Sequence, residues 1–182
     1  MTPWEQNAQW VENDLYFDFS KAVSAFKLDE DGKDGHGLSC FLKSVDFIVQ
    51  WENQFWLIEV KDPENGKIPA QHRSHQLKSF KNDLESNTLI EKHLFPKLRD
   101  SLIYLGMNNG IPNISMRYIC LIAVGSLGVA ELSGLKQALW NTEWVKGPAR
   151  GWSKNFDIQC LNIEQWNKHL KNCPITRISE VT

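Results

Sequence analysis

Two short apolar segments separated by three polar residues constrain this chain most. Residues 45–51 (VDFIVQW) and 55–61 (FWLIEVK) are rich in β-branched and aromatic side chains, and residues 52–54 (ENQ) lie between them. Such runs are typical of strands, and a connection this short favours an antiparallel hairpin. The second run is apolar on both faces over its first half, as in a central strand covered by helices. We therefore expect this hairpin to lie in the middle of a sheet.

Helical and strand-like patterns alternate around the hairpin. The pattern predicts helices at residues 10–27, 69–86, 89–105 (bent near Pro96), 130–140 and 163–170, strands at 38–42, 116–124 and 156–161, and a surface loop at 29–35. A helical region between the second hairpin strand and the strand at 116–124 permits a right-handed parallel crossover. This order predicts an α/β, or α+β layered, domain with a mixed sheet flanked by helices.

The chain length of 182 residues suits one domain, for which we expect a core at about residues 10–125 and an added strand and helix within 126–182. The formal net charge of −2 excludes a generally basic nucleic-acid coat protein, so any nucleic-acid contact must use a local basic surface. No apolar run has the length of a membrane span, and the first residues do not resemble a leader peptide. We expect a cytoplasmic protein with no membrane contact.

Three charged residues lie where the hairpin strands begin and end. Asp46 opens the first strand, whereas Glu59 and Lys61 close the second and share one face because side chains alternate along a strand. Two carboxylates brought together in apolar surroundings are costly unless a cation lies between them. Mg²⁺ prefers oxygen ligands and keeps several waters, so one or two carboxylates suffice to bind it. The alternative is a surface salt bridge of Lys61 with one carboxylate, which contributes at most about 1 kcal/mol.

This arrangement resembles the PD-(D/E)XK nuclease superfamily, through VDFIV at residues 45–49 and WLIEVK at 56–61. The resemblance covers roughly residues 10–125 by the order of elements, and Val45 replaces the proline of the family's name. It implies a restriction-endonuclease-like core that hydrolyses phosphodiester bonds with Mg²⁺ or Mn²⁺, in DNA rather than RNA. By the same resemblance the metal ligands are Asp46, Glu59 and the carbonyl of Val60, and Lys61 is the catalytic lysine.

The segment that follows the hairpin is basic. Residues 67–81 contain no acid and six basic side chains, namely Lys67, His72, Arg73, His75, Lys78 and Lys81. Because this helix follows the proposed site directly, we expect it to contact a phosphate backbone through Arg73, Gln76 and Lys78. The resemblance implies that Gln76 or Arg73 touches the scissile phosphate. A solvated helix face is the alternative interpretation of the same run.

Glu12 is the best candidate for an additional metal ligand. Many members of the superfamily carry an acid on the helix before the hairpin, and Asp14 and Asp18 are the next candidates in this chain. A glutamate in the first turn of a helix, favoured by the helix dipole, is the alternative.

Two functions of different classes follow from these residues. The first is a metal-dependent nuclease, which in this superfamily often works as a homodimer that cuts two strands. The second is a binding or assembly module that retains the nuclease fold, with hydrolysis absent or dependent on a partner protein. The presence of all three residues Asp46, Glu59 and Lys61 favours the first.

Overall fold

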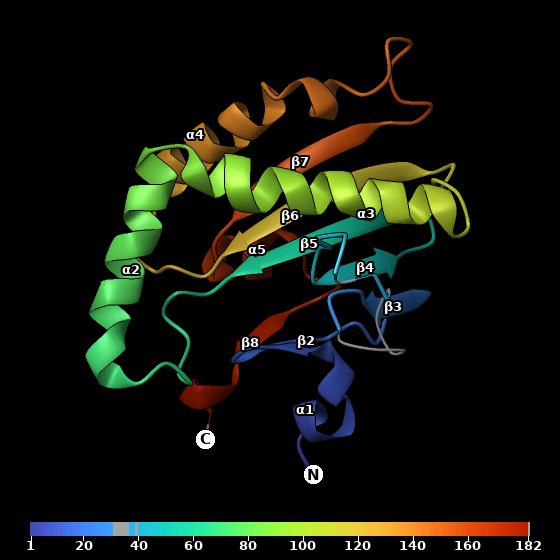
Figure 1. The fold of residues 1–182 in the computed structure, drawn as a ribbon. Coiled ribbons are helices and arrows are strands. Elements are labelled where there is room, and N and C mark those ends of the chain that lie inside the picture. Colours follow the sequence, from blue (N-terminus) through green and yellow to red (C-terminus); the bar gives the residue numbers. More distant parts are fainter. Residues whose placement is uncertain (31–36, 39, 182) are drawn as a thin grey trace.

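A five-stranded mixed sheet forms the centre of the molecule (Figure 1). The computed structural model describes residues 1–30, 37, 38 and 40–181, without the side chain of Trp144. The strand order is β3-β4-β5-β6-β7, with β3 (Ser24–Lys27), β4 (Phe47–Gln50), β5 (Gln54–Lys61), β6 (Ser115–Ile122) and β7 (Phe156–Leu161). β4 is antiparallel to both of its neighbours, β3 and β5, whereas β5, β6 and β7 run parallel to one another. The predicted mixed sheet is confirmed.

The hairpin of β4 and β5 forms as the sequence predicts. Its turn closes with a hydrogen bond from the Trp51 N–H to the Gln54 carbonyl at 2.8 Å. The register pairs Phe47 with Ile58 and Gln50 with Phe55. Because β5 also pairs with β6 along its whole length, it is a central strand, which explains why both of its faces are apolar.

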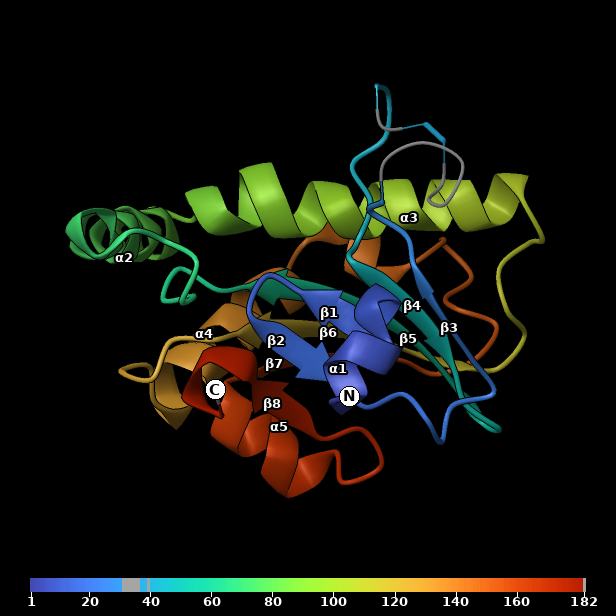
Figure 2. The same ribbon diagram turned by 90° about the horizontal axis from the view of Figure 1, so that it is seen from below.

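Helices cover both faces of this sheet (Figures 1 and 2). The helical segments are α1 (Pro3–Gln6), η1 (Ala8–Trp10), α2 (Ala70–Glu85), the π-helical η3 (Leu89–Leu94), α3 (Phe95–Met107), α4 (Val129–Trp140), η4 (Glu143–Lys146), α5 (Ile163–His169) and η5 (Ile178–Glu180). One core packs α3 and α4 against side chains such as Leu57 and Tyr118, and the other packs α5 against Trp56 and Ile119. Among the described residues no helix is both long and apolar enough to cross a membrane.

The prediction of a helix at residues 10–27 is wrong. This stretch forms β1 (Val11–Glu12) and β2 (Leu15–Phe17), which pair through a two-residue turn, and then β3 of the central sheet. Asn13 in that turn has φ +55°, a conformation that asparagine tolerates. All three residues of β2 are buried, so the apolar spacing reflects a strand covered on both faces rather than one helical stripe.

A second, three-stranded sheet of order β1-β2-β8 lies on the side of α5 (Figure 2). Its last strand, β8 (Ile175–Arg177), was not predicted because three residues give no readable periodicity. The predicted strand at 38–42 is also wrong, since the Phe41 and Leu42 N–H groups both donate to the Leu38 carbonyl in a turn. Most of the predicted loop at 29–35 lies outside the described residues. The helix predicted at residues 89–105 forms as the π-helical η3 followed directly by α3, with Pro96 in the first turn of α3.

Candidate functional site

The hairpin places Asp46, Glu59 and Lys61 together on the face of the sheet that α3 covers. Asp46 directly precedes β4, and continuing the register by one residue sets it opposite Glu59. The Lys61 Nζ lies 2.8 Å from Glu59 Oε1. The Val60 N–H donates to Asp46 Oδ2 at 2.6 Å, which fixes this carboxylate against the end of β5. The three residues on which the sequence hypothesis depends therefore converge.

A fourth charged residue, Lys97 of α3, joins this cluster. Its Nζ lies 3.4 Å from Asp46 Oδ1 and 3.3 Å from Glu59 Oε2, so one cation contacts both carboxylates. The sequence pattern did not single out Lys97, because it looks like an ordinary lysine on an amphipathic helix. In the structure Lys97 lies on the inward side of the helix, since Leu94 and Ser101, at i−3 and i+4, are both fully buried.

Both carboxylates are withdrawn from solvent. Glu59 is fully buried and Asp46 is 5% exposed. Burial and the neighbouring Asp46 charge raise the pKa of Glu59 to about 8, against the opposing effect of Lys61 and Lys97. Burial likewise raises the pKa of Asp46 to about 6, although Lys97 lowers it. Among the described residues, neither Glu59 oxygen accepts a hydrogen bond of good geometry, although the Lys61 and Lys97 ammonium groups lie 2.8 and 3.3 Å away. The raised pKa values mean that this pair does not hold both negative charges at neutral pH without a further cation.

The oxygen atoms of Asp46 and Glu59 are of the kind that bind a hard divalent cation. The two unsatisfied Glu59 oxygens and Asp46 Oδ1 are carboxylate oxygens, the ligands that Mg²⁺ and Mn²⁺ prefer. The N–H and C=O of one strand residue point to the same side, so the Val60 carbonyl lies on the β4 side of β5, as does the Val60 N–H that donates to Asp46. Within the described part of the chain, no group of three or more His, Cys, Asp or Glu residues could hold a metal. Binding would therefore rely on two carboxylates, a carbonyl and water.

The structure does not bring Glu12 into a three-acid group with Asp46 and Glu59. Glu12 lies on β1 rather than on a helix, and its carboxylate pairs with the Lys27 Nζ at 3.1 Å. Its charge still reaches the site, because it contributes to raising the pKa of Asp46. The two other candidate acids of this stretch have structural partners: Asp14 binds Ser179, and Asp18 caps the Ser20 N–H.

The three expected substrate contacts on α2 have different environments. Arg73 donates to the carbonyls of Ile68 and Gly66, so it stabilises the loop before the helix. Gln76 is exposed and lines a polar pocket of about 450 Å³ together with Lys61. Lys78 is exposed but does not line this pocket.

His93 lines the same pocket and was not predicted from the sequence. Burial lowers its pKa, and so does the nearby Lys61 charge. It belongs to the π-helical segment η3, a type of local structure that often occurs at functional sites. The pocket therefore gathers side chains from β5, α2 and η3 beside Lys61.

Arg177 of β8 fixes the end of β5 directly after Lys61. Its guanidinium donates to both oxygens of Asp62, at 2.9 and 3.0 Å, in the two-pronged geometry that makes such pairs strong. It also pairs with Asp14 at 3.4 Å, and Asp14 in turn accepts from the Gly66 N–H. The small sheet thus holds the strand end and the following loop in place.

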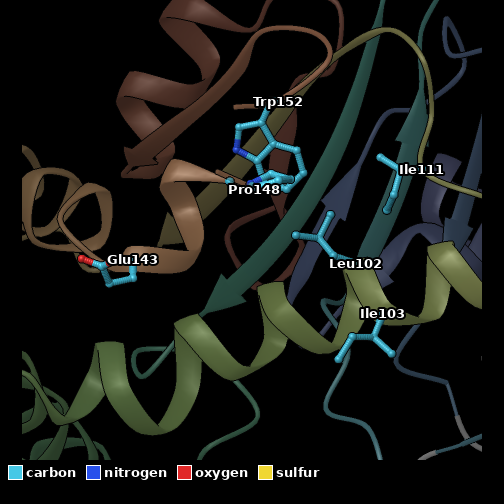
Figure 3. A pocket seen from close by; sticks show the side chains of 7 residues that line it. Leu102, Ile103, Ile111, Glu143, Pro148 and Trp152 are labelled. Atoms are coloured by element: carbon cyan, nitrogen blue, oxygen red, sulfur yellow. The ribbon is translucent and has the colours of Figure 1, made fainter. Parts of the chain in front are cut away.

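A second pocket, of about 430 Å³, lies between α3 and the segment after η4 (Figure 3). Its lining is almost entirely apolar and includes Leu102, Pro148 and Trp152. The Trp152 indole N–H donates a hydrogen bond to the Val145 carbonyl at 2.9 Å. None of the charged residues of the hairpin lines this pocket, and it offers no group for acid–base chemistry beyond the exposed Glu143.

Glu59 should make the stability of the metal-free protein depend on pH. Its carboxyl ionises at its ordinary pKa of 4.5 when unfolded and near 8 when folded. Between these values the folded state binds more protons, so the free energy of unfolding should fall as pH rises from about 5 to 8. Urea unfolding in EDTA at pH 5, 6.5 and 8 measures this. Glu59→Gln should show a flatter dependence than the wild type, and an unchanged slope in this variant would contradict the assignment.

Comparisons of the chain with protein-family models, with curated proteins and with solved structures found no match.

Proposed function

We propose that this protein is a divalent-metal-dependent nuclease that hydrolyses phosphodiester bonds, in DNA rather than RNA. The observation that carries the proposal is that Asp46 and Glu59 converge on one cation position. The Lys97 ammonium lies there, 3.4 Å from Asp46 Oδ1 and 3.3 Å from Glu59 Oε2. The Lys61 ammonium lies 2.8 Å from the same glutamate. Two carboxylates with an adjacent lysine at a strand end match the motif of the PD-(D/E)XK superfamily. The hairpin and the parallel β5–β6 crossover support a restriction-endonuclease-like core.

In this proposal Asp46, Glu59 and the Val60 carbonyl hold Mg²⁺ or Mn²⁺. A bound divalent ion lowers the pKa of a water molecule and stabilises negative charge on a phosphate. The hydrogen bond from the Val60 N–H orients Asp46 and leaves its Oδ1 for other contacts. Glu59 positions the Lys61 ammonium, which lines the polar pocket and there orients the attacking water or neutralises charge that develops on the phosphate.

Helix α2 provides the surface for the substrate backbone. His72, His75 and Lys78 are exposed on it, and Gln76 connects it to the pocket that contains Lys61. A local basic face of this kind attracts phosphates although the net charge of the chain is −2. Arg73 contributes by stabilising the loop that leads from β5 to this helix.

A binding or assembly module that retains the fold is the second candidate function. The observation that favours it is that Lys97 already supplies a positive charge to both Asp46 and Glu59. With that internal cation the cluster is compensated in part without a metal. Such a module would bind nucleic acid or a partner protein. The substitution Asp46→Asn would then leave this binding unchanged.

A cleavage assay separates the two functions. Purified protein is incubated with plasmid and with labelled single-stranded DNA in Mn²⁺, in Mg²⁺ and in EDTA, beside Asp46→Asn prepared in the same way. A nuclease should cleave with metal only, and the variant should lose at least 100-fold in rate. Equal cleavage by both proteins would identify a contaminant, and no cleavage by either would favour the module.

Gln76→Leu should lower the cleavage rate about tenfold, because a leucine removes one substrate hydrogen bond worth about 1.4 kcal/mol. Gln71→Leu provides a matched control, since Gln71 is exposed on the same helix but does not line the pocket. Single-turnover rates on a labelled oligonucleotide measure the effect. An equal loss in both variants would mean that the pocket does not receive the substrate.

A further inference from the structure

In the part of the chain that the structure describes, the Lys97 ammonium on α3 contacts three carboxylates rather than two. Its shortest contact, 2.9 Å, is with Asp29 Oδ2, whereas Asp46 and Glu59 lie at 3.4 and 3.3 Å. Asp29 follows β3 and lies outside the hairpin, and its side chain is 40% exposed while that of Glu59 is fully buried. The ammonium therefore lies between a buried pair of acids and a third acid that borders solvent.

Asp29 is itself held in place, because its Oδ1 accepts a hydrogen bond of 3.4 Å from Ser44 Oγ while Oδ2 faces Lys97. Ser44 is buried, two residues before Asp46. The lysine side chain is long and flexible, so it can keep one partner while it releases another. Asp29 thus offers Lys97 a partner that does not depend on Asp46 or Glu59.

An ammonium and a divalent cation cannot share the position between Asp46 and Glu59, because two positive charges at such a distance repel each other. We infer that Lys97 is a built-in counter-ion that compensates the Asp46–Glu59 pair without metal, withdraws toward Asp29 when a divalent cation binds, and so competes with that cation. This inference rests on the proposed metal site and adds a positioning residue that sets its affinity.

Two substitutions should change cation affinity in opposite directions. Lys97→Met removes the competitor, so Mn²⁺ should bind about tenfold more tightly than to the wild type. Asp29→Asn removes the alternative partner, so Lys97 should stay on the pair and Mn²⁺ should bind roughly threefold to tenfold more weakly. Asp29 is half-exposed, so its variant tests the inference even if Lys97→Met fails to fold.

Calorimetric titration of Mn²⁺ into EDTA-stripped protein measures these affinities without reference to cleavage. Lys92→Met is the matched control, because Lys92 is exposed in the preceding segment and makes none of these contacts. A second readout is the side-chain ¹⁵N signal of Lys97 during a Mg²⁺ titration, identified by its absence in Lys97→Met. This signal should shift on cation binding, while the other lysine signals outside the site should not.

Unchanged or weaker Mn²⁺ binding by Lys97→Met would overturn the inference. So would the absence of binding by both wild type and Lys97→Met, since the Asp46–Glu59 pair would then bind no divalent cation with which Lys97 could compete. If Lys97→Met binds more tightly and no variant cleaves DNA, the inference stands and the proposed nuclease function fails. If the wild type cleaves DNA and Lys97→Met leaves the affinity unchanged, the function stands and the inference fails.

Discussion

Replacing Lys61 with methionine should lower the rate of metal-dependent DNA cleavage about 100- to 1,000-fold, the effect of removing one charge-stabilising donor from an active site. The ammonium of Lys61 is held 2.8 Å from Glu59 and lines the pocket beside the proposed metal site. Methionine keeps the length and apolar stem of the side chain but cannot donate a hydrogen bond or carry charge. Single-turnover rates at saturating Mn²⁺ measure the loss.

Mn²⁺ affinity should not fall in Lys61→Met, since the variant removes a positive charge beside Glu59 and leaves both proposed carboxylate ligands intact. Lys171→Met, which alters an exposed lysine after α5, should retain the wild-type rate within a factor of three. A Lys61→Met protein that cleaves as fast as this control would remove Lys61 from the mechanism. It would also favour the simpler interpretation of the Lys61–Glu59 contact as a structural ion pair.

Replacing Arg177 with methionine should lower the free energy of unfolding by about 3–5 kcal/mol, the usual cost of leaving one member of a buried ion pair without its partner. The side chain of Asp62 is fully buried, and both of its oxygens accept from this guanidinium. Burial raises the pKa of Asp62, and Arg177 is the charge that opposes this effect. Urea unfolding at pH 7 measures the difference.

The double variant Arg177→Met, Asp62→Asn should recover more than half of that loss, because an amide tolerates burial far better than an unpaired carboxylate. Arg150→Met serves as a control on an exposed arginine and should change stability by less than about 0.5 kcal/mol. A loss below about 1 kcal/mol in Arg177→Met would show that the small sheet does not fix the end of β5. The same result would weaken the explanation for the position of Lys61.

The part of the site that the sequence predicted is the part set by local geometry. A three-residue connection leaves little freedom of register, so Asp46 and Glu59 had to meet at one end of the hairpin. Alternation along β5 then placed Lys61 on the same face. These conclusions needed no knowledge of the rest of the chain.

The site residues that the sequence did not predict come from distant segments. Lys97 is 51 residues from Asp46, and Arg177 is 115 residues from Asp62. Their contacts depend on how α3 crosses the sheet and how β8 joins β2, which no local pattern determines. Pair contacts of this kind follow from tertiary packing and become visible only in the folded structure.

The wrong prediction at residues 10–27 has a physical cause. Apolar residues at three- and four-residue steps match a helix, but a completely buried strand such as β2 shows no alternation that would reveal it. The turn at Asn13 and the aromatic content of the stretch were the better signals. The predicted position of Glu12 was wrong for the same reason. Glu12 lies on a strand beside Lys27 rather than on a helix that faces Asp46 and Glu59.

Anomalous X-ray scattering from a crystal soaked in Mn²⁺ tests the central claim most directly. The predicted result is one strong peak within about 2–2.5 Å of carboxylate oxygens of both Asp46 and Glu59, with the Lys97 ammonium retained by Asp29. A crystal of Glu59→Gln should lack the peak. A wild-type crystal in which Lys97 still bridges Asp46 and Glu59, with manganese elsewhere or absent, would contradict the proposed metal site.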